Sequence, residues 1–133
     1  MSTKRETQIV QEMYAAYGAG NMEALKATLS DDILWIYHGT EEIHHANTYK
    51  GKDGVMQFFN NVNEHIEYLD FQPKQFITEG NTVVVLGNEK QKIKQNNEIL
   101  EQGWVQVYTV ENGLITKMEE FSNTSYAVKV HTK

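Results

Sequence analysis

The chain has 133 residues, of which 40% are hydrophobic and 23% are charged, and its formal net charge is −6. A chain of this length and composition forms one globular domain around one hydrophobic core, so we expect a single domain over residues 1–133. The absence of cysteine excludes disulfides, thiolate nucleophiles and cysteine-based zinc sites, and a negative charge without a basic run argues against nucleic-acid binding.

Two helices are predicted before residue 30. Thr3 and Glu6 stand at the spacing of a capping box, in which side chains satisfy free backbone amides at a helix start. Apolar residues then recur at spacings of three and four across residues 9–17, as on one face of a helix. Asn21 follows at a position where it can cap a second, short helix over residues 22–29.

A strand, a loop and a third helix come next. The segment "ILWIYH" (33–38) is rich in β-branched and aromatic residues, which favours a strand. We interpret residues 39–51 as a loop. After it, apolar residues keep helical spacing over 55–66, and Asp53 lies near the positive end of that helix dipole.

From residue 67 the pattern changes to that of a sheet. Four extended segments follow one another, at 67–78, 81–94, 99–110 and 114–122. The links "EGN" and "ENG" are short enough for antiparallel hairpins. Pro73 lies inside the first of these segments, which places that strand at an edge of the sheet or bends it. The chain is expected to end in a short helical or irregular tail.

Helices followed by antiparallel strands make an α+β domain. The segments "YAAYGAGNMEALKATLSDDILW", "YKGKDGVMQFF" and "GWVQVYTVENGLITKMEEFSNT" resemble the SnoaL-like, ketosteroid-isomerase-related group of the nuclear-transport-factor-2-like superfamily. The resemblance covers roughly residues 6–128. It implies three N-terminal helices packed in the concave face of a curved, mostly antiparallel sheet, which together form a cone-shaped α+β barrel with one apolar pocket. It also implies dimerisation through the outer sheet face.

The strand after residue 103 agrees with a sheet that is covered on both sides. Trp104, Gln106 and Tyr108 share one face, whereas Val105 and Val107 share the other, because side chains alternate along a strand. Large apolar groups on both faces indicate that the core covers one face and a partner subunit covers the other. We therefore expect a homodimer.

The resemblance implies an acidic pocket residue that moves a proton next to a carbonyl. In one pattern of the group this acid ends the first strand, where the chain has Tyr37 followed by His38. In another pattern a histidine and an aspartate act from the last two strands, where the chain has Gln106 and Asn123. An amide cannot take up a proton near neutral pH, so we expect neither mechanism to transfer directly.

Three other residues could act in acid–base catalysis, and each has a structural alternative. His38 ends the first strand and carries a side chain suited to proton transfer; the alternative is a histidine that contacts backbone. Glu89 can point inward with the apolar residues of its strand or lie at the solvated end of a hairpin. Glu119 alternates with Ile115 and Phe121 and has the same two alternatives.

Aromatic and amide side chains are predicted to line the pocket and contact a ligand. They are Tyr14, Tyr17, Trp35, Tyr49, Phe58, Trp104, Gln106, Tyr108, Phe121 and Asn123. For the two tyrosines of the first helix, the alternative is a core position with the hydroxyl at its edge. For Asn123 the alternative is the cap of a terminal helical turn. Which face of strand 33–38 lines the pocket stays open.

Three of the five histidines, His38, His44 and His45, lie in one short stretch. Their spacings match none of the zinc-binding patterns H-x-H, H-E-x-x-H and H-x-x-x-H, so we expect no metal site and no cofactor. The resemblance places the loop 39–51 over the pocket mouth. We expect a rim of polar and aromatic side chains there, which touch a ligand rather than react with it.

Two classes of function follow. The first is an enzyme, an isomerase, cyclase or hydrolase, that acts by general acid–base chemistry on a small hydrophobic carbonyl or epoxide compound. The second is a non-catalytic protein that binds a similar ligand or serves as a dimeric assembly module. The start "MSTKRETQ" lacks the apolar core of a signal peptide, and no stretch has the roughly 18 apolar residues of a membrane span, so we expect a cytoplasmic protein without a membrane partner.

Overall fold

The computed structural model describes residues 4–133, which form helices packed against one six-stranded sheet. In chain order the elements are α1 (Arg5–Gly18), α2 (Met22–Ala27), β1 (Leu29–Tyr37), β2 (Asn47–Lys50), α3 (Gly51–His65), β3 (Ile66–Glu79), β4 (Thr82–Ile93), β5 (Ile99–Glu111), β6 (Leu114–Ser122) and α4 (Thr124–His131). The strand order is β2-β1-β6-β5-β4-β3, and every neighbouring pair is antiparallel except β1 and β6. This architecture confirms the predicted fold class.

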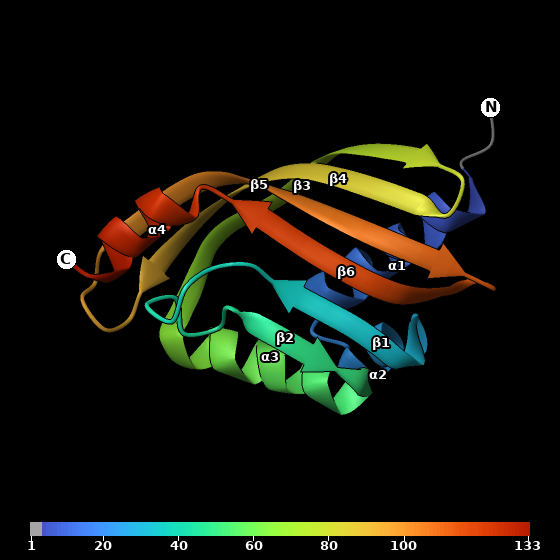
Figure 1. Cartoon of the computed structure of the whole chain (residues 1–133), viewed down its shortest axis with the longest axis horizontal. Coiled ribbons are helices and arrows are strands. Elements are labelled where there is room, and N and C mark those ends of the chain that lie inside the picture. Colours follow the sequence, from blue (N-terminus) through green and yellow to red (C-terminus); the bar gives the residue numbers. More distant parts are fainter. Residues whose placement is uncertain (1–3) are drawn as a thin grey trace.

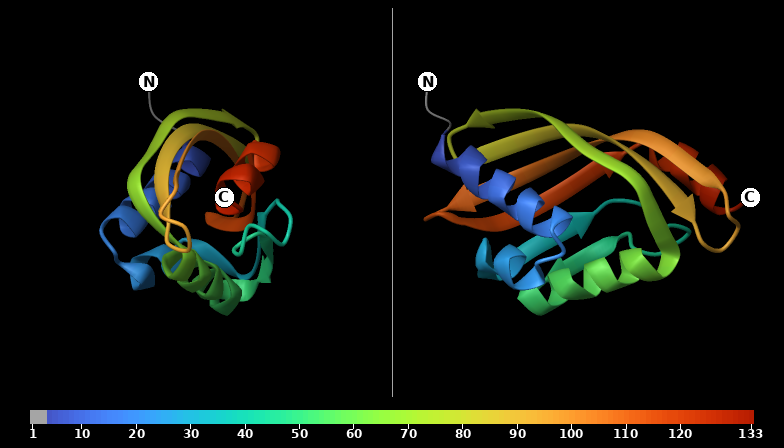
Figure 2. Two further views of the ribbon diagram at one scale, coloured as in Figure 1. Left: turned by 90° about the vertical axis from the view of Figure 1, so that its left-hand side faces the viewer. Right: turned by 180° about the vertical axis from the view of Figure 1, so that it is seen from behind.

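The sheet is strongly curved. The long strands β3, β4, β5 and β6 form an arched layer in Figure 1, and the end-on view in Figure 2 shows them curling around the helices as part of a ring. α4 lies at one end of this cone, near β5. α3 has 15 residues, and no helix within residues 4–133 is long and apolar enough to cross a membrane.

Local sequence signals account for several of these boundaries. Asn21 caps α2 as predicted, because its side-chain oxygen accepts a hydrogen bond from the backbone N–H of Ala24 at 3.0 Å. α3 buries the apolar face predicted over residues 55–66. Thr3, the predicted cap of α1, lies outside the described residues, and Lys4 occupies the N-cap position without a side-chain capping bond.

β2 lies in a segment that the sequence indicates as a loop. Its four residues pair antiparallel with β1, where Tyr49 lies opposite Trp35. Tyr49 is the one buried residue of this strand. A four-residue strand with one buried side chain has no alternating pattern for the sequence to show. The predicted loop is therefore shorter and spans residues 38–46.

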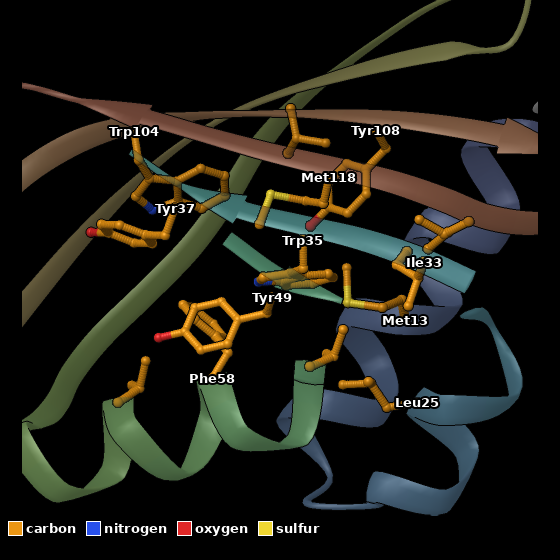
Figure 3. Close-up of a cluster of buried hydrophobic side chains, with 14 of the residues drawn as sticks. Met13, Leu25, Ile33, Trp35, Tyr37, Tyr49, Phe58, Trp104, Tyr108 and Met118 are labelled. Atoms are coloured by element: carbon orange, nitrogen blue, oxygen red, sulfur yellow. The ribbon is translucent and has the colours of Figure 1, made fainter. Parts of the chain in front are cut away.

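The core fills the space between the sheet and the helices. In Figure 3 the Trp35 ring lies between Tyr108 and Phe58, with ring-centroid distances of 6.3 and 5.8 Å. Burying a side chain such as Phe58 stabilises the fold by about 1.5–3 kcal/mol. The buried face of β1 carries Trp35 and Tyr37, so this face, rather than the face next to His38, turns to the core.

Candidate functional site

A β-bulge in β6 decides which of two neighbouring acids faces the interior. The register of β6 against β5 shifts by one residue at Thr116. Ile115 before the bulge is buried, and so are Met118 and Glu120 after it, whereas Glu119 lies on the outer face. An extra residue reverses the alternation of the side chains that follow. The predicted uninterrupted alternation of Glu119 with Ile115 is therefore wrong, and Glu120 carries the inward carboxyl.

Glu120 belongs to a hydrogen-bonded network that links β6, β5 and α1. It lies opposite Gln106, whose Nε2 donates to Glu120 Oε1 at 2.7 Å. The hydroxyl of Tyr108 donates to Gln106 Oε1 at 2.6 Å, and the hydroxyl of Tyr14 donates to the same oxygen. Both phenols therefore direct protons to Gln106, which orients its N–H group toward the carboxyl.

A small cavity adjoins this network, between α1, α3 and the inner face of the sheet. Eight of its eleven lining residues are aromatic; the lining residues are Met13, Tyr14, Tyr17, Trp35, Phe58, Phe59, Tyr68, Phe71, Gln106, Tyr108 and Glu120. The cavity volume is about 30 Å³, enough for a water molecule or two. Sites for larger ligands commonly enclose about 300–1,000 Å³. The deep pocket implied by the resemblance is therefore almost filled by the protein's own side chains.

The cavity has a buried floor and a partly buried rim. The rim consists of five rings, and we call Tyr14, Tyr17, Phe59, Tyr68 and Phe71 the aromatic rim. Tyr17 of α1 stacks on Phe59 of α3 with their ring centroids 5.1 Å apart, and Phe71 of β3 stacks on buried Trp104 at 4.9 Å. Rings from three different elements thus meet over the cavity, and their rotation changes the free space inside it.

Burial dominates the electrostatics of the two interior carboxyls. It raises the pKa of Glu120 well above its usual value; the charge of Glu89 raises this pKa further, and the hydrogen bond from Gln106 lowers it. Burial also raises the pKa of Glu89, to about 7. Neither carboxyl forms an ion pair with another described residue. The raised pKa favours the protonated form of Glu120, which can donate its proton.

The sequence matches the family model of the SnoaL-like domain over residues 10–118. The chain belongs to the SnoaL-like domain family. A solved nuclear-transport-factor-2-like protein from Burkholderia xenovorans LB400 shares 29% identity and a TM-score of 0.89, with 98% of each chain covered. A second such protein, of unknown function, from Burkholderia pseudomallei K96243 shares 27% identity and a TM-score of 0.89, with 98% of this chain and 100% of that chain covered.

More distant structures have the same fold. A candidate polyketide cyclase from Xanthomonas campestris pv. campestris shares 18% identity and a TM-score of 0.75, with 96% of each chain covered. No curated protein matches the chain significantly. The resemblance predicted from the sequence is therefore confirmed at the level of family and fold.

The SnoaL-like protein brings His38 and Glu119 together on the outer face of the sheet. His38 Nε2 lies 3.0 Å from Glu119 Oε2, and Lys117 Nζ lies 3.1 Å from Glu119 Oε1. The Phe121 ring stacks on the His38 ring with centroids 4.6 Å apart. None of these residues lines the aromatic cavity. Their predicted site roles stay predictions, and the geometry gives them no contact with the cavity.

Glu89 faces the interior, as the alternation of its strand predicts. Its Oε2 accepts a hydrogen bond at 2.6 Å from Gln102 Nε2, which belongs to the residue opposite it on β5. Glu89 does not line the aromatic cavity, but its charge acts on Glu120. Its predicted catalytic role stays a prediction, and its position suits tuning of the Glu120 pKa.

Six of the predicted ligand-binding residues line the cavity, namely Tyr14, Tyr17, Trp35, Phe58, Gln106 and Tyr108. The other four lie elsewhere: Tyr49, Trp104, Phe121 and Asn123. Trp104 is buried beside the cavity, in contact with the aromatic rim. Asn123 caps α4, where its side-chain oxygen accepts a hydrogen bond from the backbone N–H of Tyr126 at 3.1 Å. The capping alternative therefore describes the position of Asn123.

Five cavity residues escaped prediction: Met13, Phe59, Tyr68, Phe71 and Glu120. The helical periodicity of α1 and α3 marks Met13 and Phe59 as core residues, which is a usable signal for the cavity as well. Tyr68 and Phe71 share one face because the register of β3 shifts just after Tyr68. Glu120 depends on the bulge at Thr116. A bulge leaves no simple mark in the sequence, so these three positions were not accessible to pattern reasoning.

The loop 38–46 does not border the cavity. The ring of buried His45 packs edge-on against Tyr37 with centroids 4.6 Å apart, and burial lowers the pKa of His45 to about 3. His44 stacks on His65 at the end of α3. No group of three or more His, Cys, Asp or Glu residues within 4–133 could hold a metal ion. The rim of this cavity comes from α1, α3 and β3, and the predicted ligand contacts of the loop stay a prediction.

Proposed function

We propose that this SnoaL-like protein binds a small hydrophobic molecule in the aromatic cavity and exchanges a proton with it through Glu120. One observation carries the proposal: a buried carboxyl, whose pKa burial raises, lies in the wall of an aromatic cavity, where Gln106 holds it. A positioned proton donor or acceptor in an apolar site is the basic element of general acid–base catalysis.

The network leaves one carboxyl oxygen for a ligand. Gln106 bonds Oε1 of Glu120, so Oε2 is the atom that gives a proton to a basic ligand atom or takes one back. Tyr14 and Tyr108 hold Gln106 in turn. The direction of the carboxyl is thus set by side chains from α1 and β5, which support one another through hydrogen bonds.

A ligand of several heavy atoms must displace part of the aromatic rim, because the cavity in this structure has a volume of only about 30 Å³. The rim rings are partly exposed, whereas the floor residues are buried. Partly exposed side chains change rotamer faster than a packed core rearranges. We propose that Tyr17 and Phe59, which close the gap between α1 and α3, separate when a ligand enters.

Binding without turnover is the second candidate. Gln106 and Asn123 occupy the places where the resemblance implies proton acceptors, and both are committed to structural hydrogen bonds, Gln106 to Glu120 and Asn123 to the start of α4. A catalytic cycle would therefore depend on Glu120 as the one acid in contact with the ligand.

We also propose that two copies associate through the outer face of the sheet. Phe121 lies opposite Val105 and Ile77 lies opposite Val84, so apolar side chains run across this face. Phe121 and Ile77 are 44% and 47% exposed in the single chain. Light scattering after gel filtration should give the mass of a dimer, and Phe121→Asp should give the mass of a monomer. A wild-type monomer would refute this association.

The test of the cavity compares the wild type with the Glu120→Gln variant. A library of small neutral, acidic and basic fragments is screened by saturation-transfer NMR, and each hit is incubated in D₂O and followed for deuterium incorporation and product. Loss of the acid should reduce proton exchange by a factor of about 100 or more. Glu119→Gln, which changes the neighbouring acid on the outer face, should keep both binding and exchange.

Equal binding and equal exchange in the wild type and in Glu120→Gln would contradict the proposal. Binding that depends on Glu120, without exchange or product for any fragment, would instead select the second candidate.

A further inference from the structure

We infer that the molecule taken up by the aromatic cavity is a small organic cation, a protonated amine on an apolar body, whose N–H group bonds Glu120 Oε2. This inference rests on the proposed function, because it concerns the same cavity, and it adds the chemical class of the ligand.

The interior contains carboxyls without a lysine or arginine. The buried ionisable side chains of the described residues are Glu89, Glu120, His45, His131 and the tyrosines Tyr37, Tyr49 and Tyr108. The titratable groups that face Glu120 from the surrounding elements are Tyr14 and Tyr17 of α1, Tyr37 of β1, Tyr68 of β3, Glu89 of β4 and Tyr108 of β5. Each of these groups is neutral when protonated and negative when deprotonated, so none of them carries a positive charge. A positive charge near Glu120 must therefore come from a ligand.

The hydrogen bonds of the network leave acceptors free rather than donors. The hydroxyl protons of Tyr14 and Tyr108 are directed to Gln106 Oε1, and the amide of Gln106 donates to Glu120. Within this network, what remains for a ligand is Oε2 of Glu120, which is an acceptor once the carboxyl is ionised, and the lone pairs of the phenol oxygens. These atoms match a ligand that donates N–H groups.

One donor is left over at the cavity. Trp35 Nε1 is buried and has no acceptor in the structure, and Trp35 lines the same cavity. A hydroxyl or carbonyl oxygen elsewhere on the ligand would satisfy this N–H group. An amine that also carries an oxygen would therefore bond both Glu120 Oε2 and the N–H group of Trp35.

The aromatic walls suit the carbon atoms next to a charged nitrogen. A cation within about 6 Å of a ring centroid is attracted by the negative face of the ring, and several rings add their fields. Eight aromatic rings line the cavity beside the one carboxyl, Glu120. A cation in the cavity is thus close to several rings and meets one carboxylate. The overall charge of −6 further favours the approach of cations.

Binding of an ammonium ion should expel the proton of Glu120. The protonated carboxyl and the ammonium ion enter the complex as a carboxylate–ammonium pair, and one proton passes to the buffer. Ligand affinity should then rise by up to tenfold per pH unit for as long as Glu120 of the free protein is protonated. A neutral ligand of the same shape releases no proton, and its affinity should not change with pH.

The test uses cyclopentylammonium and cyclopentanol, which have nearly the same shape but differ in charge. Isothermal titration calorimetry near pH 6, 7 and 8 in phosphate, a buffer without an amine, reports the affinity, and the slope of the logarithm of the affinity against pH gives the protons released per ligand. We expect at least tenfold tighter binding of cyclopentylammonium near pH 7, with release of about one proton. Equal or tighter binding of cyclopentanol, or a cyclopentylammonium affinity that does not change with pH, would overturn the inference.

Two variants separate charge from shape. Glu120→Gln should weaken cyclopentylammonium binding at least tenfold and remove its pH dependence, and it should leave cyclopentanol binding unchanged. Phe59→Leu keeps the rim apolar but removes a ring, and it should weaken only the cation. Glu111→Gln, at the exposed end of β5, is the matched control for a lost surface charge. Thermal melts followed by circular dichroism establish that each variant is folded.

The inference about the class of ligand and the proposal that the cavity binds a ligand can be refuted separately. If cyclopentanol or other neutral fragments bind in a manner that depends on Phe59 but cyclopentylammonium does not, the cation inference falls and the cavity stands. If the wild type binds neither probe and no fragment of any charge, both the cation inference and the proposed function are refuted.

Discussion

Raising the pH from about 5 to about 8 should destabilise the wild type relative to the Glu89→Gln variant. The carboxyl of Glu89 is 2% exposed, and burial raises its pKa from 4.5 to about 7. In the unfolded chain the carboxyl ionises near 4.5, whereas in the folded protein it keeps its proton until about 7. The stability contributed by this proton is therefore fully present below pH 4.5 and is lost as the pH rises through 7.

The size of the effect follows from the shift. A change from 4.5 to about 7 corresponds to about 3 kcal/mol of unfolding free energy, and the deep burial of Glu89 means that water screens little of it. This is a large part of the roughly 5–15 kcal/mol that holds a domain together. Glutamine removes the titration but keeps an oxygen that accepts the hydrogen bond from Gln102.

Urea denaturation at several pH values measures the effect. The difference in unfolding free energy between the wild type and Glu89→Gln should change by about 3 kcal/mol over the window. Groups that do not interact with Glu89 act equally in both proteins and cancel in this difference, whereas Glu120, whose pKa the charge of Glu89 raises, contributes to it. Glu67→Gln, on the exposed side of β3, should show no such change. Parallel stability curves for the wild type and Glu89→Gln would refute the assignment of a proton to this buried carboxyl.

Three further predictions concern other parts of the fold. His45→Gln should remove an acid-side loss of stability, since a folded-state pKa of about 3 means that protonation opposes folding as the pH falls below 6.5; an unchanged acid slope in urea would contradict this. Gly87→Ala should cost about 1–3 kcal/mol in urea unfolding, because a Cβ there would lie 2.3 Å from Trp104 Cζ2, and an unchanged midpoint would be the opposing result. Asn123→Ala should remove the α4 cap and destabilise the helix by about 1 kcal/mol, seen as faster amide exchange confined to residues 124–131; equal exchange would speak against the cap.

The helices and strands that were predicted correctly are those with a pattern in their own residues. The stripe over residues 9–17, the cap at Asn21 and the alternation of the long strands depend on residues close together in the sequence, and the structure contains α1, α2 and β3 to β6 where these patterns indicate. β2 has four residues and exists because it pairs with β1, so its cause lies outside its own sequence.

The residues of the candidate site also include some that local patterns indicate and some that they do not. Tyr14, Gln106 and Tyr108 were accessible from helical and strand periodicity. Glu120 was not, because the extra residue Thr116 reverses the inward face of β6. The choice between two adjacent glutamates thus depends on backbone pairing, which composition and periodicity do not encode.

The parallel pairing of β1 with β6 has a consequence for the time course of folding. These strands lie far apart in the sequence, and Trp35 of β1 lies beside Met118 of β6. Closing so long a loop is slow compared with hairpin formation, and during synthesis β1 cannot find this partner until residue 122 has left the ribosome. We expect the wall that bears Glu120 to be completed last, so that the nascent chain exposes the inner aromatic residues to chaperones until its final strand docks.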